Sequence, residues 1–422
     1  MGFNNVFSNL RCKFSVALGL NELSLGNKSF LLTHLSFMFF ATIPGVFIST
    51  FFFRQTGKIS TVITFAAVNC FVQALTMQFS SVVAIKKSPV FVMRVGIILF
   101  NVLYISLLIF QHRASNFVFV FGIISGISNG FYWQSYNSLL KKFTHSGDFN
   151  RTLSIVGLSN SAVQLVVPIF SGIIITRIGG SFGYTVIFLL AFVFSVVTTI
   201  QSTRIPVFKL NDKPNLRKTY IKIFKTPKWN LLFISEFFRG LREIAFPTFL
   251  NIIFFKYIQN EALLGLNTMA CGIAAIISFY LSGTIIKPNN RIKCTAIASS
   301  VLFVVYLLVF IKINAIIILA LSIVNAFMVT YILNPAVGAL YGMYEGEHDD
   351  INFAQYMAAH ELFLAFGRAL GCVIMIELTM SAKNYPYALL ILNATAFLGL
   401  GFLYLAQRAK NSEIQALSSD EH

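Results

Sequence analysis

The chain has 422 residues, of which 56% are hydrophobic and only 11% are charged. A water-soluble chain carries about a quarter charged residues, so this composition leaves too little polar surface to cover a soluble fold. The net charge of +17 would suggest a nucleic-acid partner in a soluble protein, but here Lys and Arg gather in short loops between apolar segments. We therefore expect an integral membrane protein that lies in a lipid bilayer and binds no nucleic acid.

Apolar segments long enough to cross a bilayer as a helix, about 20 residues each, recur twelve times along the chain. The first six predicted helices cover residues 30–53, 59–84, 90–110, 116–139, 152–176 and 182–202. The second six cover residues 230–255, 262–286, 294–312, 314–342, 353–379 and 385–406. The predicted class is an all-α membrane protein with twelve transmembrane helices in two bundles, 30–202 and 230–406. An N-terminal segment (1–29), a basic linker (203–229) and a C-terminal tail (407–422) complete the chain.

The distribution of basic residues predicts the orientation. If the N-terminus is cytoplasmic, the inner loops between helices contain these cations: Lys86, Lys87, Arg151, Lys287 and Arg291. The outer loops carry only isolated cations such as Arg113. Because positive residues are retained on the cytoplasmic side, this asymmetry predicts a multi-pass protein of the cytoplasmic membrane with both termini inside.

One inner loop is acidic instead, with Glu345, Glu347, Asp349 and Asp350 before the eleventh helix. It is either a solvated turn that places negative charge near a helix N-terminus or an ionic latch onto the basic inner loops. The latch would make gating residues of Asp349 and Asp350 together with Lys86, Lys87, Arg151, Lys287 and Arg291.

The basic linker is the one long polar connection between predicted helices. Residues 216–225 interleave apolar side chains with Arg and Lys. This pattern is compatible with a short helix at the inner membrane surface, which would bury its apolar side among acyl chains, and with a loose tether.

The two halves of the chain resemble each other at a nearly constant spacing. Residues 46–54 align with 248–256, and residues 148–150 align with 350–352 at the same shift. Ile85-Lys86 aligns with Ile286-Lys287 one residue off that shift. A repeat with an even number of spans gives both halves the same orientation, which is the parallel-repeat plan with an axis along the membrane normal.

Twelve helices, a parallel six-helix repeat and a basic linker together resemble the major facilitator superfamily. Short stretches of the sequence are also similar to a little-characterised bacterial branch of this superfamily. They are residues 45–54, Gly130-Phe131-Tyr132-Trp133-Gln134-Ser135-Tyr136-Asn137, Asn150-Arg151, and Pro168 with Gly172. The resemblance implies the fold of that superfamily, transport by alternating access and a monomer as the working unit.

The sequence departs from the signature loops of the superfamily, which read like G-x-x-x-D-R-x-G-R. The loop after helix two is Ala84-Ile85-Lys86-Lys87-Ser88-Pro89, without the acid, and its second-half copy has Lys287 where Asp is expected. Helix five keeps only Pro168 and Gly172 of the glycine series of drug/proton antiporters. These departures argue against the usual charge-relay gate and against a standard multidrug exporter.

Ionisable residues inside the predicted spans gather in the second half. Intramembrane charges are expensive, so they normally face a partner or a cavity. Helix seven places Glu236, Arg239 and Glu243 on one stripe, with Arg242 rotated aside. Helix eleven carries a second set: His360, Glu361 and Arg368. Their depths in the membrane allow the interhelical pairs Arg239–Glu361 and Glu243–Arg368.

These charges have two readings. They form either a structural network that holds helices together, or a proton-coupling site in which a buried carboxylate beside an arginine exchanges its proton. In the second reading the first candidate is Glu243, followed by Glu361, with Glu236 in the same stripe. His360 acts either as a proton relay or in helix packing.

Polar and aromatic residues suggest where a substrate would bind. Trp133, Tyr136 and Asn137 in helix four suit an amphipathic or cationic group, although they would also serve as packing or interfacial residues. Gln164 and Asn334 are further polar candidates. Arg239, Arg242 and Arg368 would bind substrate or pair with acids, and they favour a substrate with a carboxylate or phosphate.

The chemistry that the sequence lacks narrows the function. There is no Walker-type phosphate loop, no HExxH motif and no CxxC pair among the five cysteines. We therefore expect no metal, no cofactor and no enzyme. The leading hypothesis is a secondary active transporter that moves a small organic solute, coupled to protons; the alternatives are a lipid or glycolipid flippase on the same fold and a non-transporting membrane sensor or partner protein.

Overall fold

The computed structural model describes residues 23–143, 149–209, 215–311, 313–345 and 353–420. The helices of the first half follow the predicted spans within a few residues. They are α2 Leu25–Thr56, α3 Ile59–Lys86, α4 Pro89–Phe110, α5 Val118–Phe143, α6 Phe149–Ile178 and α7 Gly180–Ser202. Pro89 begins α4 at a position where a missing N–H does no harm, and the Ser88 side chain caps that helix.

The second half contains two broken helices. Its helices are α9 Pro227–Glu243, α10 Ala245–Ile258, α11 Glu261–Ile285, α12 Arg291–Tyr306, α13 Ala315–Met328, α14 Thr330–Glu345, α15 Phe353–Leu378 and α16 Tyr385–Asp420. The predicted spans 230–255 and 314–342 are each divided, at Ile244 and at Val329. Pro247 accounts for the first break, because it offers no N–H to the carbonyl of Glu243 and its ring would clash there.

Within the described residues, ten helical segments are long and apolar enough to cross a membrane. The two predicted spans outside this set are the broken pair α9–α10 and the charged helix α15. With these two predicted spans, the described helices form two groups of six segments each, as the sequence predicts. The two exceptions are the helices that carry the intramembrane charges.

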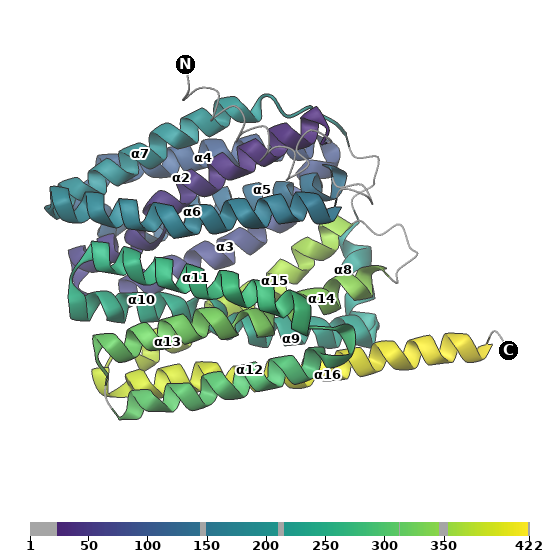
Figure 1. The fold of residues 1–422 in the computed structure, drawn as a ribbon. Helices are drawn as coiled ribbons and strands as arrows, with labels where there is room; N and C mark the ends of the chain where they lie inside the picture. The colour runs from purple at the N-terminus through teal and green to yellow at the C-terminus, as the bar shows by residue number, and fades with distance from the viewer. Residues whose placement is uncertain (1–22, 144–148, 210–214, 312, 346–352, 421–422) are drawn as a thin grey trace, which may run out of the picture.

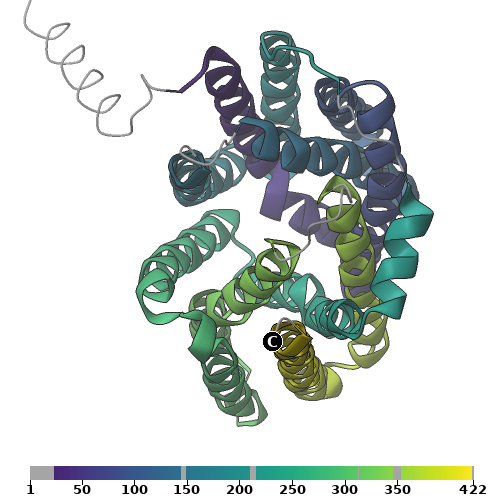
Figure 2. The ribbon, with the colours of Figure 1, turned by 90° about the vertical axis from the view of Figure 1, so that its right-hand side faces the viewer.

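The bundles lie side by side, with α2–α7 in the upper half of Figure 1 and α9–α16 in the lower half. Their main contacts are α3 against α15 and α6 against α11. Small residues permit the second contact: a Cβ added at Gly265 would lie 2.6 Å from the carbonyl oxygen of Pro168. The view along the bundle axis in Figure 2 separates the same two groups of helices.

The linker contains α8 Leu216–Lys225, a helix rather than a loose tether. Asn215 caps it by accepting from the backbone N–H of Lys218, and Ile223 is buried. The Tyr220 hydroxyl donates to Oε1 of Gln78 on α3 at 2.8 Å. Burial raises the pKa of Tyr220 to about 12, so this hydroxyl stays a donor at neutral pH. The linker helix therefore touches the first bundle as well as the second.

The C-terminal segment is also more ordered than a tail. Helix α16 runs without a break to Asp420 and projects beyond the bundle in Figure 1. Its extension is held by a salt bridge of 3.0 Å between Lys228 and Glu413, and by a hydrogen bond of 2.8 Å from Lys410 to the carbonyl of Gly342. Residues 407–420 of the predicted tail thus continue the last helix.

Candidate functional site

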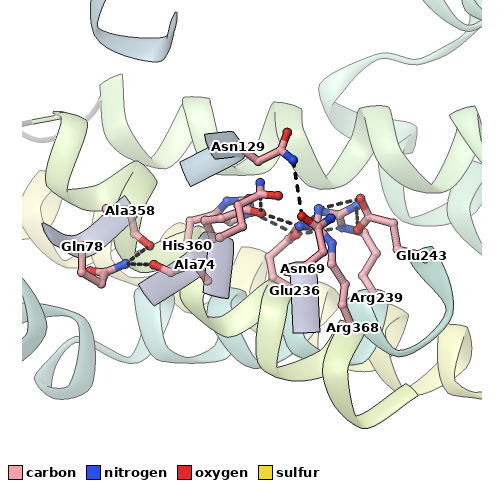
Figure 3. A network of polar contacts seen from close by, with 12 residues as sticks. Asn69, Ala74, Gln78, Asn129, Glu236, Arg239, Glu243, Ala358, His360 and Arg368 are labelled. Carbon is pink, nitrogen blue, oxygen red and sulfur yellow. Dashed lines mark hydrogen bonds and ion pairs between the residues drawn. The ribbon is translucent and has the colours of Figure 1, made fainter. Parts of the chain in front are cut away.

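The charged residues of α9 and α15 form one connected set (Figure 3), which we call the ion network. Arg239 contacts Glu236 at 2.6 Å and Glu243 at 2.9 Å. Arg368 contacts Glu243 at 2.9 Å and also pairs with Glu361. His360 completes the set, with Nε2 3.1 Å from Oε2 of Glu236.

One predicted interhelical pair is present and the other is not. Glu243 and Arg368 join the two helices. Arg239 does not pair with Glu361, because carboxylates three and four positions away on its own helix take its guanidinium. Glu361 also pairs within its own helix, with Arg368 seven positions further along α15.

Glycines bring the two helices close enough for these contacts. A Cβ at Gly240 would collide with the carbonyl oxygen of Leu364 on α15. A Cβ at Gly367 would collide with that of Phe237, and one at Gly371 with that of Leu241. Small residues on both faces let the backbones approach, so the short glutamate side chains reach across the interface.

The ion network carries an excess of negative charge. It contains three carboxylates and two guanidinium groups, so one negative charge remains when His360 is neutral. Glu236 is only 1% exposed, whereas the side chain of Glu243 is 28% exposed. A single added proton would bring the set to neutrality, which is an arrangement suited to taking up and releasing a proton.

The ion network extends to the first bundle through glutamine side chains. Nε2 of Gln73 on α3 donates to Oε1 of Glu361 at 3.3 Å. One turn closer to the end that carries α8, Nε2 of Gln78 donates to the carbonyl of Ala358 at 2.6 Å (Figure 3). The α3–α15 interface between the halves therefore includes a member of the ion network.

Arg242 lies apart from the ion network, as its rotation on the helix predicts. It lines a cavity of about 270 Å³ inside the second bundle. Its Nη2 donates to Oδ1 of Asn325 at 2.6 Å, and its guanidinium lies 5.1 Å from the ring centre of Phe246. Arg239 and Glu243 line the same cavity, which joins it to the ion network.

The aromatic residues predicted to bind substrate lie on α5 in the first bundle, next to a residue that the sequence analysis did not single out. Trp133 and Tyr136 pack on His34 of α2, with ring centres 6.2 Å and 4.5 Å away. Nδ1 of His34 lies 2.8 Å from the hydroxyl of Tyr132. A histidine within an apolar span was the available signal. Asn137 is half-buried on the same helix.

The remaining candidates are dispersed. Asn334 donates to Oγ of Ser282 at 2.8 Å, which links α14 to α11, and Gln164 is exposed on α6. Lys86, Lys87 and Lys287 are exposed, and Arg291 packs beside Gly338. The side chain of Arg151 and the whole of Asp349 and Asp350 lie outside the described residues, and so does the acidic part of the predicted latch.

A second polar cluster, which the sequence analysis missed, joins the halves at the opposite end. Arg54 at the end of α2 contacts Glu261 at the start of α11 at 2.6 Å. The Tyr184 hydroxyl on α7 lies 2.8 Å from the same carboxylate and 3.1 Å from Oγ1 of Thr50. We call these residues the end clasp. Glu261 is only 3% exposed, so these partners take the place of water around its carboxylate.

Comparison with known proteins agrees with this architecture. Residues 30–344 match the model of the Major Facilitator Superfamily. The chain is 23% identical over 354 residues to the uncharacterized protein YqgE of Bacillus subtilis (strain 168), covering 83% of this chain and 82% of that protein. It is 26% identical over 148 residues to the "uncharacterized protein in sodM 3'region" of Geobacillus stearothermophilus, covering 35% of this chain and 69% of that protein.

Two solved structures share the fold. A D-xylose-proton symporter matches with a TM-score of 0.65 at 12% identity, over 90% of this chain and 96% of that chain. A structure from work on proton dependent oligopeptide transporters matches with a TM-score of 0.68 at 12% identity, over 91% of this chain and 99% of that chain. At this level of identity the likeness establishes the fold alone.

Proposed function

The chain belongs to the Major Facilitator Superfamily, a family of transporters and not of enzymes, and we propose that it moves a small organic solute across the cytoplasmic membrane by alternating access, coupled to protons. In this proposal the protein works as a monomer. Both of its termini lie in the cytoplasm, because the basic loops favour that side of the membrane. The parallel two-bundle architecture supports the mechanism, because the halves can rock against each other around a site between the helices.

The observation that carries the proton-coupling proposal is the composition of the ion network. Three carboxylates share two guanidinium groups in a span where an unbalanced charge is expensive. The most exposed of these carboxylates is Glu243, which makes it the first candidate for exchanging a proton with water. The proton-coupled systems named for the two solved structures lend support by analogy of fold.

The ion network also has a route to conformational change. Glu361 accepts a hydrogen bond from Gln73 on the other bundle, and separating α3 from α15 breaks that bond. Arg368 contacts both Glu361 and Glu243. A proton on either carboxylate therefore removes one of the two ion pairs of this arginine. We therefore assign Glu243, Glu361 and Arg368 to coupling, with Glu236 and His360 as the buried end of the set.

The test compares cells that lack the gene with cells that carry it back as the original, as Glu243→Gln or as Glu377→Gln. Glu377 is exposed on the same helix as Arg368 and belongs to no part of the ion network, so it is the matched control. Metabolites of cells and medium are profiled for a solute whose distribution depends on the gene. The original chain and Glu377→Gln should restore that distribution, and Glu243→Gln should fail at equal protein levels.

Purified protein in liposomes then tests the coupling itself. The solute found in cells should enter faster when a proton gradient of the correct sign is imposed, and the Glu243→Gln variant should lose this acceleration. Equal acceleration in both proteins would remove Glu243 as the coupling residue. If no soluble metabolite depends on the gene and a headgroup-labelled lipid crosses the bilayer instead, the proposal of solute transport is wrong.

A further inference from the structure

The cavity inside the second bundle is formed by one half of the molecule only. Its walls come from α9, α10, α12, α13, α14 and α16, and none of its lining residues belongs to the first bundle. The volume of about 270 Å³ lies just below the ~300 Å³ at which sites for small ligands begin.

The walls are mainly apolar, and the polar lining residues are Ser235, Arg239, Arg242, Glu243, Thr295 and Asn325. Val329, Ile332, Leu333, Leu400 and Leu403 contribute aliphatic surface. Arg242 of α9 and Asn325 of α13 are hydrogen-bonded to each other, and both line the cavity. A site of this kind fits a ligand with an aliphatic body and one polar head.

Arg242, which lines this cavity, has donors that make no hydrogen bond to any described residue. Its side chain is only 4% exposed, and among the described residues Nε and Nη1 have no hydrogen-bond partner. Glu243, the next residue in the sequence, does not act as the acid partner of Arg242, because its two carboxylate oxygens already accept from Arg368 and Arg239. A buried guanidinium without an acid partner is expensive, and a carboxylate is the group that its planar donors fit best.

The surroundings fix the guanidinium and limit the charge of its partner. Phe246 lies under it, and Tyr306 packs on the same ring at 4.7 Å. Arg239, the other cation that lines the cavity, is already paired with Glu236 and Glu243. One uncompensated cation between apolar walls suits a single negative charge, whereas a phosphate dianion would need further donors.

We propose that this cavity binds a small aliphatic monocarboxylate, with its carboxylate on Arg242 and its chain among the aliphatic side chains of α14 and α16. The inference rests on the proposed function where it identifies this ligand class with the transported solute. Because Arg239 and Glu243 border the cavity, a ligand there lies next to the residues assigned to proton coupling.

The test measures binding to the purified full chain by titration calorimetry, with hexanoate as the probe. Hexanamide controls for the charge, and hexyl phosphate controls for the dianion. Hexanoate should bind saturably at one site, and hexanamide at least tenfold more weakly. Replacing Arg242→Gln should weaken hexanoate binding at least tenfold, while Arg408→Gln, an exposed arginine on α16, should leave it unchanged. Equal binding of hexanoate and hexanamide, or tighter binding of hexyl phosphate, would overturn the proposal.

A second variant protects the test against misfolding of the arginine mutant. Ala396 lines the cavity, and Ala396→Leu fills it while it leaves every charge in place. This variant should also lose hexanoate binding at least tenfold and should elute as the original protein does. Undiminished binding to Ala396→Leu would contradict this location of the site.

Flux separates this inference from the proposed function. Saturable hexanoate binding that depends on Arg242, with no hexanoate flux in liposomes, would support the site and count against a transport role for its ligand. Proton-driven flux of another solute, lost in Glu243→Gln, together with absent hexanoate binding, would overturn the site and leave the proposed function standing.

Discussion

Glu236 and Glu243 share the same arginine but differ in what surrounds them. Glu236 is almost fully buried and contacts Arg239 and His360, whereas Glu243 keeps more than a quarter of its side chain exposed. Removing one member of a buried ion pair leaves an uncompensated charge in a region where water cannot solvate it. The two positions should therefore respond differently to the same substitution.

The Glu236→Gln substitution should lower the stability of the protein by about 3 kcal/mol, as expected for breaking a buried pair. Glu243→Gln should have a smaller effect, because Arg368 keeps Glu361 and Arg239 keeps Glu236. Thermal unfolding in detergent measures the decrease in Tm of each variant relative to the original protein. The control is Glu377→Gln, which should leave Tm unchanged, and a larger fall for Glu243→Gln than for Glu236→Gln would contradict this reading.

At the scale of helices, the spans could be predicted because apolar length is a property of each segment by itself. The break at Ile244 was missed although Pro247 was visible, since a proline within an apolar run does not say which neighbour will satisfy the lost hydrogen bond. In α14, the freed carbonyl of Tyr331, four residues before Pro335, accepts from Thr295 of α12 at 3.3 Å. That compensation depends on tertiary packing.

The ion network also contains one part that the sequence predicts and one part that depends on tertiary packing. Helical spacing placed Glu236, Arg239 and Glu243 on one stripe, and depth in the membrane identified Glu243–Arg368. The partner of Arg239 was not predictable, because its own helix and α15 both offered carboxylates. The cavity at Arg242 was also beyond sequence reasoning, since six helices form its walls.

The contact between α9 and α15 depends on glycine at positions where a side chain has no room. Gly367→Ala should force the backbones apart, lower Tm and lengthen the Glu243–Arg368 contact, because its Cβ would collide with the carbonyl of Phe237. Gly401→Ala on α16 is the matched control, since nothing lies within 4 Å of the position its Cβ would take. That change should be neutral or stabilising by up to about 1 kcal/mol. Equal Tm values for the two variants would refute the close-approach argument.

Polar contacts connect the two halves of the molecule at both of its ends. On the side of α8, the α3–α15 interface contains Gln78 and Ala358, and Tyr220 of the linker helix joins it through Gln78. At the other end, the end clasp ties α2 and α7 to α11. In the alternating-access mechanism that we propose, contacts at one end loosen while those at the other hold. The end clasp is thus the feature whose loss should bias the equilibrium between states.

Glu261→Gln should open the end of the molecule that the end clasp closes. The amide would leave Arg54 without its ionic partner and weaken the contact to Tyr184, although α11 keeps its Asn260 cap. Spin labels at Lys58 and Tyr257, exposed positions on the two halves near this end, report the separation once the five native cysteines are replaced. The distance distribution should move to longer values in Glu261→Gln, and Arg54→Lys, which preserves the charge, should shift it less. An unchanged distribution in Glu261→Gln would mean that apolar packing between α6 and α11, rather than the end clasp, keeps this end closed.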